Sequence, residues 1–363
     1  MKIIKFVPLF SPFLLIACGK SDNSKENSND YIVQKNYEVV NFPSRAQNER
    51  ISSLIFHYTA LNFENSLAQL TKNPDGVSAH WLIPDTGKKI YKLVDEKKRP
   101  YHAGVSYWKR RADLNDTSVG VEIVNLGFRC INNQNSDQCP IYERDWKPYI
   151  SSQIKLIIQL AKGIQSRYKI DPLCVVGHSD IAIGRKSDPG PLFPWEQLAK
   201  QGVGAWVSPE EISLQMSQLE SVLNEDLQDL TLQMRLFEFG YDIKNPMYSD
   251  FYIYKSINTL LASYLSELSQ KDPKLKEWKS IPFGNVSALN ELNKKAKNFS
   301  ESIFINSVYE NGLYAFLMHY LPNDYFKVIE KRNIDSQDKK KILATIQALL
   351  IKYPARAKSN CGY

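Results

Sequence analysis

The hydrophobic and polar positions of the chain follow two different periods up to about residue 207. Short apolar runs that predict β-strands occupy residues 52–60, 78–94, 118–125 and 173–178. Apolar residues spaced three or four positions apart, which predict amphipathic helices, occupy residues 62–70 and 149–168. Strands interspersed with helices are typical of the α/β class, in which helices cover a central sheet. We therefore expect an α/β domain in this part of the chain.

The pattern changes after Trp206. Ser208 followed by Pro209 predicts a helix that begins at Pro209, because serine caps helix N-termini and proline is tolerated at the first helical position. The remaining sequence is rich in Leu, Lys, Asn and Ser and contains few β-branched runs. We therefore expect a boundary near residue 207 and a mostly α-helical domain over residues 208–363.

Residues 1–17 have the layout of a secretory signal peptide. Lys2 and Lys5 precede an apolar run of about a dozen residues, shorter than the roughly 20 that a transmembrane helix needs. Residues 18–35 hold too few apolar side chains to form a core, which predicts a flexible tether. The α/β domain is then expected over residues 36–207.

Leu15-Ile16-Ala17-Cys18 resembles a bacterial lipobox, in which the cysteine is lipidated and becomes the first residue of the mature chain. An ordinary signal peptide with a coincidental cysteine is the alternative. Acyl chains on Cys18 would anchor the protein to a membrane, since each buried CH₂ contributes about 0.8 kcal/mol. An aspartate directly after the lipidated cysteine commonly retains lipoproteins at the inner membrane. This chain has Gly19 at that position. We expect an outer-membrane lipoprotein that faces the periplasm.

Composition and charge narrow the choice of partner. The 363 residues are 43% hydrophobic and 23% charged, as in folded domains, and are numerous enough for two of them. The formal net charge is +7, and loss of Lys2 and Lys5 with a signal peptide lowers it by two, to +5. A basic protein is attracted to anionic partners such as nucleic acid or the bacterial wall. Nucleic acid is disfavoured, because the sequence contains no nucleic-acid-binding motif and no dense basic cluster near aromatic residues.

The five cysteines include no CxxC pair, which disfavours zinc ribbons and thioredoxin-type redox chemistry. Export would permit disulfides. Cys130 and Cys139 flank a polar segment, and a bridge between them would remove about 2.5 kcal/mol of unfolded-state entropy, so we favour this pair. Cys174 lies in an apolar strand-like run, where we expect a buried thiol, and Cys361 stays unassigned.

The histidines provide candidate metal ligands. His57 and His178 each end an apolar strand, where the sites of α/β proteins tend to assemble. Lys186 and Asp188 follow in a loop rich in glycine and proline. Two imidazoles and one carboxylate, with a fourth position left open, form the ligand set of a catalytic zinc ion. The alternative is two strand-end histidines that only satisfy backbone groups.

Five motifs permit comparison with a known family: FHYTA (56–60), VSAHWLI (77–83), YHAGVSYW (101–108), LNDTSVGVEIVN (114–125) and VVGHSDIAIGRKSDPGPLFPW (175–195). Together they resemble zinc-dependent N-acetylmuramoyl-L-alanine amidases, the type 2 amidases that share a fold with peptidoglycan recognition proteins and phage T7 lysozyme. The resemblance covers roughly residues 40–206. With its lipobox, the full length looks like the AmiD-type outer-membrane lipoproteins of this family.

The resemblance implies a fold and an activity. The fold is α/β, with a central mixed β-sheet flanked by helices. The activity is hydrolysis of the amide bond between N-acetylmuramic acid and L-alanine in peptidoglycan or muropeptides, for cell-wall remodelling or recycling. The alternative is a peptidoglycan recognition module that binds without cutting. Such relatives commonly lack a zinc ligand, whereas this sequence retains all three.

The resemblance also implies roles for individual residues. His57, His178 and Asp188 match the ligands of one zinc ion. Glu122 matches the acid that activates water, and burying a carboxylate in an apolar strand is costly without such a purpose. Lys186 matches the cation beside the scissile carbonyl, although a solvated loop lysine would be the default for this residue alone.

The other three histidines lie outside this ligand set. His80 and His102 lie in motifs that recur near the groove of the family, which implies substrate contact or support of the sheet. By chemistry alone, a hydrogen-bonded core histidine is the favoured interpretation for His80, and the two interpretations balance for His102. His319 falls on an expected helix of the second domain, where we expect no catalytic role.

The helical domain carries a weaker resemblance. Residues 232–243, 312–322 and 339–354 resemble the three helices of the small peptidoglycan-binding module that often ends this lipoprotein group. About 70 residues separate the first two where the family has a short connection, which implies an insertion at about 244–307. Wall binding and a purely structural packing domain both remain open. The expected partners are peptidoglycan, muropeptides and, through Cys18, a membrane, with no nucleic acid and a monomeric state.

Overall fold

A computed structural model of the chain describes the following residues: 44, 49–72, 76–132, 139–220, 225–243, 307–354 and 361. The expected signal peptide, the lipidated Cys18 and the tether lie outside them, as does the expected insertion up to residue 306. The described residues from 49 onward belong to one compact unit.

Five strands form the central sheet in the order β3-β2-β6-β1-β9. They are β1 (Ser53–Tyr58), β2 (Trp81–Ile83), β3 (Tyr91–Lys92), β6 (Ser118–Ile123) and β9 (Val175–Gly177). Only β3 runs antiparallel to its neighbour, so the sheet is mixed, as the family resemblance implied. The carboxyl ends of the four parallel strands therefore meet at one edge of the sheet.

Helices flank the sheet because successive residues of a strand point to opposite faces. Leu82 packs with Leu70 of α1 (Phe63–Lys72), whereas the next residue, Ile83, belongs to the larger core. That core also holds Ile157 of α2 (Ser151–Tyr168). These contacts confirm the α/β class and the flanking helices that the sequence predicts.

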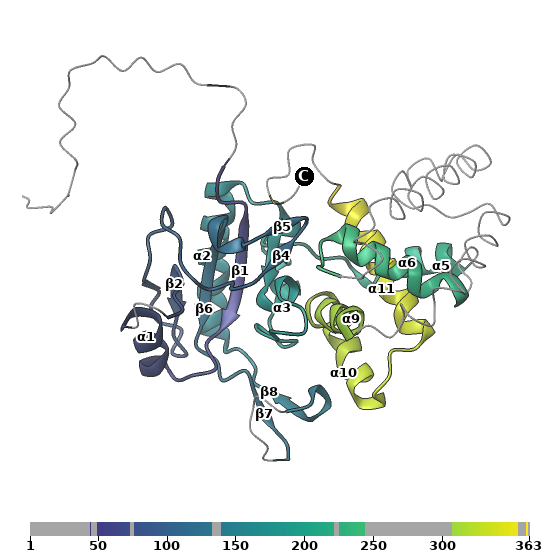
Figure 1. Cartoon of the computed structure of the whole chain (residues 1–363), viewed down its shortest axis with the longest axis horizontal. Coiled ribbons are helices and arrows are strands. Elements are labelled where there is room, and N and C mark those ends of the chain that lie inside the picture. The colour runs from purple at the N-terminus through teal and green to yellow at the C-terminus, as the bar shows by residue number, and fades with distance from the viewer. Residues whose placement is uncertain are drawn as a thin grey trace, which may run out of the picture. The chain divides into compact units, whose positions relative to one another are not determined.

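Two small hairpins lie outside the central sheet. One joins β4 (Tyr107–Trp108) to β5 (Arg111–Ala112), and the other joins β7 (Phe128–Cys130) to β8 (Arg144–Trp146). Figure 1 shows the second hairpin below the sheet, separate from it. The sequence does not predict these strands, since two or three residues are too few to display a period. Short 3₁₀ helices, η1 (Leu114–Asp116), η3 (Ile141–Glu143) and η4 (Pro172–Cys174), complete the connections.

Two short helices and a set of longer ones follow β9. The short ones are α3 (His178–Ile181) and α4 (Trp195–Lys200). The longer ones are α5 (Pro209–Glu220), α6 (Glu225–Phe239), α9 (Ser307–Tyr320), α10 (Pro322–Lys331) and α11 (Ser336–Lys352). Helix α11 packs against α5 and α6 (Figure 1). No helix among the described residues is both long and apolar enough to cross a membrane.

The start of α5 follows from its sequence. The Ser208 hydroxyl accepts a hydrogen bond from the Glu211 backbone N–H at 3.2 Å, and the Glu211 carboxylate accepts one from the Ser208 N–H at 2.6 Å. This reciprocal pair satisfies two N–H groups that a helix end leaves unpaired. The helix therefore begins at Pro209, where the sequence predicts it.

Cys174 corrects one sequence-based expectation. Its side chain is fully buried, but it forms a disulfide with Cys361 and is not a free thiol. The two cysteines are 187 positions apart in the sequence, and their Cα atoms lie 5.9 Å apart. Nothing in the local sequence of either residue indicates this pairing, because it depends on how the C-terminal helices pack.

Candidate active site

Candidate catalytic residues lie on or directly after three neighbouring strands, β6, β1 and β9. His57 on β1 and Glu122 on β6 are direct cross-strand partners, and Glu122 in turn pairs with Leu82 on β2. These three side chains therefore share one face of the sheet, the face on which Leu82 packs against α1. His178 is the first residue of α3, immediately after β9.

His57, His178 and Asp188 converge to form a buried triad. Their exposed fractions are 1%, 5% and 6%. The Nδ1 atoms of the two histidines are 3.0 Å apart, and Oδ2 of Asp188 lies 3.1 Å from the first and 3.0 Å from the second. Ligand atoms of a tetrahedral zinc site with bonds of 2.0–2.1 Å are about 3.3 Å apart. The donor set and its spacing therefore fit a zinc ion.

A chain of hydrogen bonds fixes the tautomer of His57. The Ser118 hydroxyl donates to the Leu114 carbonyl at 2.5 Å, so its oxygen is left to accept from Nε2 of His102 at 3.2 Å. Nδ1 of His102 then accepts from Nε2 of His57 at 2.9 Å. This assignment leaves a lone pair on Nδ1 of His57, directed into the triad.

His178 is oriented in the same way by the backbone. Its Nε2 atom donates to the carbonyl of Ala103 at 3.1 Å, which leaves Nδ1 free of a proton. Hydrogen bonds of this kind typically hold metal-ligating histidines in place. Both imidazoles therefore present an unprotonated nitrogen to the same point.

Burial keeps His57 and His102 neutral. Burial, together with the neighbouring His178, lowers the pKa of His57 from 6.5 to about 4. Burial, and after it the nearby His57, also lowers the pKa of His102 well below 6.5. At neutral pH, His57 can therefore act as a metal ligand and His102 as a hydrogen-bond acceptor.

Glu122 and Lys186 face the same cleft, which has a volume of about 660 Å³. The Oε2 atom of Glu122 is buried and has no hydrogen-bond partner among the described residues. Burial raises the pKa of Glu122 to about 8, and the charge of Asp188 contributes in the same direction. Lys186 is exposed at the cleft. The cleft thus combines a proton acceptor of raised basicity with a cation.

The remaining histidines have different surroundings. His102 lines the cleft and supports His57. His80 has the contacts of a core histidine, since its Nδ1 accepts from the Gly120 N–H at 3.0 Å and its Nε2 donates to the Lys98 carbonyl at 3.3 Å. His319 is buried away from the cleft, where its Nδ1 lies 2.7 Å from Oδ2 of Asp180.

The cleft also contains residues that sequence reasoning did not single out. Tyr58 and Arg185 lie within the family-like motifs, where their side chains could have been considered. The Tyr58 hydroxyl lies 3.2 Å from Oγ of Ser187, and Arg185 donates to the carbonyls of Ala103 and Val105 at 2.8 and 2.7 Å. Arg144 lies in none of these motifs and reaches the cleft only through the β7–β8 hairpin.

Cys130 and Cys139, the pair that the sequence favours, are joined in the structure by a disulfide with a Cα–Cα distance of 5.7 Å. Cys130 ends β7 and Cys139 precedes η3. The bridge therefore closes the loop of the hairpin that carries Arg144.

Sequence comparisons identify relatives of this chain. The family described as N-acetylmuramoyl-L-alanine amidase matches residues 47–191. The N-acetylmuramoyl-L-alanine amidase AmiD of Escherichia coli K12 is 40% identical over 210 residues, which cover 56% of this chain and 71% of that protein. The 1,6-anhydro-N-acetylmuramyl-L-alanine amidase AmpD of Enterobacter cloacae is 32% identical over 122 residues, which cover 34% and 55%.

Solved structures show the same relationship. E. coli AmiD in complex with the substrate anhydro-N-acetylmuramic acid-L-Ala-D-γ-Glu-L-Lys matches with a TM-score of 0.56 and 30% identity, covering 86% of this chain and 93% of that one. AmpDh3 of Pseudomonas aeruginosa in complex with anhydromuramic pentapeptide matches with a TM-score of 0.57 and 31% identity, covering 90% and 99%.

Proposed function

Because this chain belongs to the N-acetylmuramoyl-L-alanine amidase family, we propose that it hydrolyses the amide bond between N-acetylmuramic acid and L-alanine in peptidoglycan or muropeptides. The observation that carries the proposal is the buried triad of two imidazole nitrogens and a carboxylate oxygen within 3.1 Å of one another, next to Glu122. A module that only binds muropeptides would have no need of this triad, so hydrolysis is favoured over recognition alone.

The triad would hold one zinc ion through Nδ1 of His57, Nδ1 of His178 and Oδ2 of Asp188. Three protein ligands of this type, with a fourth position open, are typical of catalytic zinc. A zinc ion bound there supplies Lewis acidity, which lowers the pKa of water and polarises a carbonyl oxygen.

The protein's own side chains would move the protons and stabilise charge. Glu122 would take a proton from the attacking water and pass it to the amine of L-alanine as the amide bond breaks. The burial that raises its pKa makes the Glu122 carboxylate a stronger base than an exposed glutamate. Lys186 would stabilise the negative charge that develops on the carbonyl oxygen.

We propose substrates of the class present in the E. coli AmiD complex, in which a muramic acid carries a stem peptide with D-γ-Glu at its second position. A direct test is to incubate the purified protein with such a muropeptide and to analyse the products by mass spectrometry. Free stem peptide should appear with zinc present, disappear after exhaustive chelation and return when zinc is restored. The Glu122→Gln variant should release at least about 100-fold less peptide per unit time. Release that persists without zinc, or that never occurs with it, would contradict the proposal.

We also propose that the protein is exported and anchored to the outer membrane through Cys18, facing the periplasm. The two disulfides among the described residues support export, since disulfides persist in oxidising compartments. Metabolic labelling with a radioactive fatty acid tests the anchor. Wild-type protein should carry the label, and the Cys18→Ala variant should not. Equal labelling of both would contradict lipidation at this cysteine.

A further inference from the structure

Arg144 is a half-buried cation in the wall of the cleft that holds Glu122 and Asp188. Its Nε atom donates to the Cys139 carbonyl at 3.2 Å, and its guanidinium carbon lies 4.5 Å from the centre of the Phe128 ring. Burial lowers the pKa of this arginine. Among the described residues, no carboxylate lies within ion-pairing distance of it. A partly desolvated cation without a protein anion is costly unless a ligand supplies the charge.

The other arginine of the hairpin shows the contrast. Arg129 is adjacent to Cys130 but lies on the opposite face, where its guanidinium pairs with Asp145 at 2.9 Å. Arg144 shares its face with Phe128 and Cys130, because Cys130 and Arg144 are direct cross-strand partners. One strand pair thus carries a solvated, paired arginine on one face. On the face that meets the cleft it carries an arginine that has no carboxylate partner in the described part of the chain.

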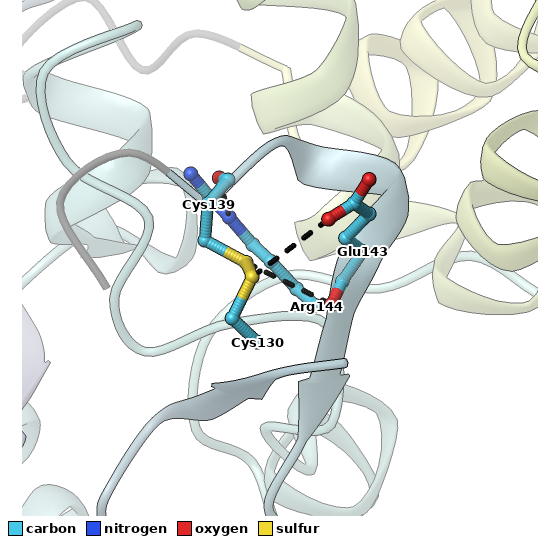
Figure 2. The surroundings of a disulfide bond; sticks show 4 residues. All are labelled: Cys130, Cys139, Glu143 and Arg144. Carbon is cyan, nitrogen blue, oxygen red and sulfur yellow. Dashed lines mark hydrogen bonds between the residues drawn. A yellow bond between two sulfur atoms is a disulfide. The ribbon is translucent and has the colours of Figure 1, made fainter. Parts of the chain in front are cut away.

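The Cys130–Cys139 disulfide lies beside the Arg144 guanidinium. Figure 2 shows the bridge bringing the Cys139 carbonyl against Nε of Arg144. The adjacent Glu143 forms no ion pair with the arginine, and its Oε2 atom lies 3.9 Å from Sγ of Cys130 (Figure 2). The Cys139 carbonyl thus occupies Nε, whereas the two terminal nitrogens have no hydrogen-bond partner among the described residues and are left to bind a ligand.

A carboxylate is the anion that a guanidinium fork binds best in a peptide. In a stem peptide the second residue is joined through its γ-carboxyl, so its α-carboxylate remains free, and the last residue carries a second free carboxylate. We propose that Arg144, positioned by the Cys130–Cys139 disulfide, binds a free carboxylate of the stem peptide. This inference rests on the proposed function, since it assigns part of the substrate to a wall of the same cleft.

Three synthetic ligands distinguish the two carboxylates. The parent is anhydromuramyl-L-Ala-D-γ-Glu-L-Lys, the second has D-isoglutamine in place of D-glutamate, and the third has a C-terminal amide. Their affinities are measured by calorimetry with zinc-loaded Glu122→Gln protein, so that no ligand is consumed. One amide should bind about 10- to 100-fold more weakly than the parent, as expected for loss of a charge-assisted contact. That amide identifies the carboxylate that Arg144 binds.

The Arg144→Met substitution in the same background should reduce parent binding to the level of that amide while leaving the amide's own affinity unchanged. Arg129→Met is the matched control, because it removes the same charge from the opposite face of the hairpin, and it should preserve the preference. Equal losses for all three ligands would indicate a structural role and overturn the proposal. Unchanged affinity of the Arg144→Met protein for the parent ligand would also overturn the proposal.

The disulfide has a separate test. Replacing both cysteines, Cys130→Ser with Cys139→Ser, should weaken the carboxylate preference several-fold while the affinity for the amide ligand stays the same. An undiminished preference would show that the bridge does not position Arg144. Cleavage by protein with Glu122 intact reports on the proposed function independently. Cleavage without any carboxylate preference refutes only the role of Arg144, and a preference without cleavage refutes only the hydrolysis.

Discussion

The Nε2 atom of His57 lies 2.9 Å from Nδ1 of His102, and both rings are buried. The position of His57 in the triad is therefore determined by a residue 45 positions further along the chain, which is itself held by Ser118. A histidine from the family-like motif YHAGVSYW thus acts through another histidine and has no need to contact the substrate.

We expect the His102→Ala substitution to lower zinc affinity by about 10- to 100-fold, because His57 loses the acceptor that fixes its tautomer and ring orientation. Competition with a chromophoric chelator measures this affinity without reference to catalysis. His80→Ala is the matched control, since it removes a buried histidine that hydrogen-bonds only to the backbone among the described residues and meets the His102 ring edge-on at a centroid distance of 6.1 Å. It should lower stability but leave zinc affinity within about twofold. Unchanged affinity in His102→Ala would refute the supporting role.

Gly120 packs directly against the His102 ring, so a substitution at Gly120 tests the same supporting role. A Cβ atom added at this position would lie 2.5–2.6 Å from three atoms of the His102 imidazole, a separation that requires the ring to move. We expect Gly120→Ala to cost about 1–3 kcal/mol of unfolding free energy and to weaken zinc binding together with it. Urea unfolding and chelator competition measure the two effects.

Gly163→Ala is the control for that substitution. Gly163 lies within α2, and an added Cβ would meet only the end of the Arg167 side chain at 3.9 Å. Alanine there should stabilise the protein by about 0.5–1 kcal/mol, because glycine is a poor helix former. If Gly120→Ala behaves like Gly163→Ala, the contact with His102 does not constrain the site.

Much of the site can be predicted from sequence for a physical reason. His57, Glu122 and His178 lie at or beside the carboxyl ends of parallel strands, so recognising those strands already brings the residues to one edge of the sheet. The hydrophobic runs identify these strands because they are buried on both faces. The helix of residues 149–168 is found in the same way, and only its start differs, since Ile150 is extended and 48% exposed ahead of α2.

The contacts that the sequence does not reveal depend on packing between distant segments. Arg144 reaches the cleft through a strand of three residues, too short to show a period. Cys174 meets Cys361, and Asp180 meets His319, only because the C-terminal helices pack against the α/β part. Cys361 and His319 lie in none of the five motifs. The residues around them therefore do not reveal their partners.

The pKa of Glu122 predicts a pH-dependent stability in zinc-free protein. This pKa is about 8 in the folded state against 4.5 ordinarily, chiefly because of burial. Between these values the folded protein holds a proton that the unfolded chain has released, so stability falls as pH rises, by at most about 1.4 kcal/mol per pH unit. Glutamine has no such proton. The unfolding free energy of Glu122→Gln minus that of wild type should therefore increase from pH 5 to pH 7.5.

Urea unfolding of the two zinc-free proteins at both pH values measures this difference. Glu330→Gln serves as the control, because Glu330 is an exposed carboxylate on α10. Its difference from wild type should be the same at pH 5 and pH 7.5. A constant difference for Glu122→Gln as well would show that this carboxyl does not titrate in the interval.

Asp180 connects the helical region to the turn that presents His178, and it leads to the last prediction. Its Oδ2 atom accepts from the Gly177 N–H at 2.7 Å, and its Oδ1 atom accepts from the Tyr241 hydroxyl at 2.6 Å, with Tyr241 fully buried. Tyr241→Phe leaves this carboxylate one donor short and should lower the unfolding free energy by about 1.5–3 kcal/mol. Because Gly177 immediately precedes His178, zinc affinity should fall as well.

Tyr309→Phe distinguishes an effect on the site from a general loss of packing. Tyr309 also donates to an aspartate, Asp229 at 2.9 Å, but this pair lies within the helical region, and the Asp229 side chain is 30% exposed. Solvent can replace the lost donor there, so the cost should be smaller and zinc affinity should not change. If both variants lose stability while neither loses zinc affinity, the helical region packs against the α/β part without holding His178 in position.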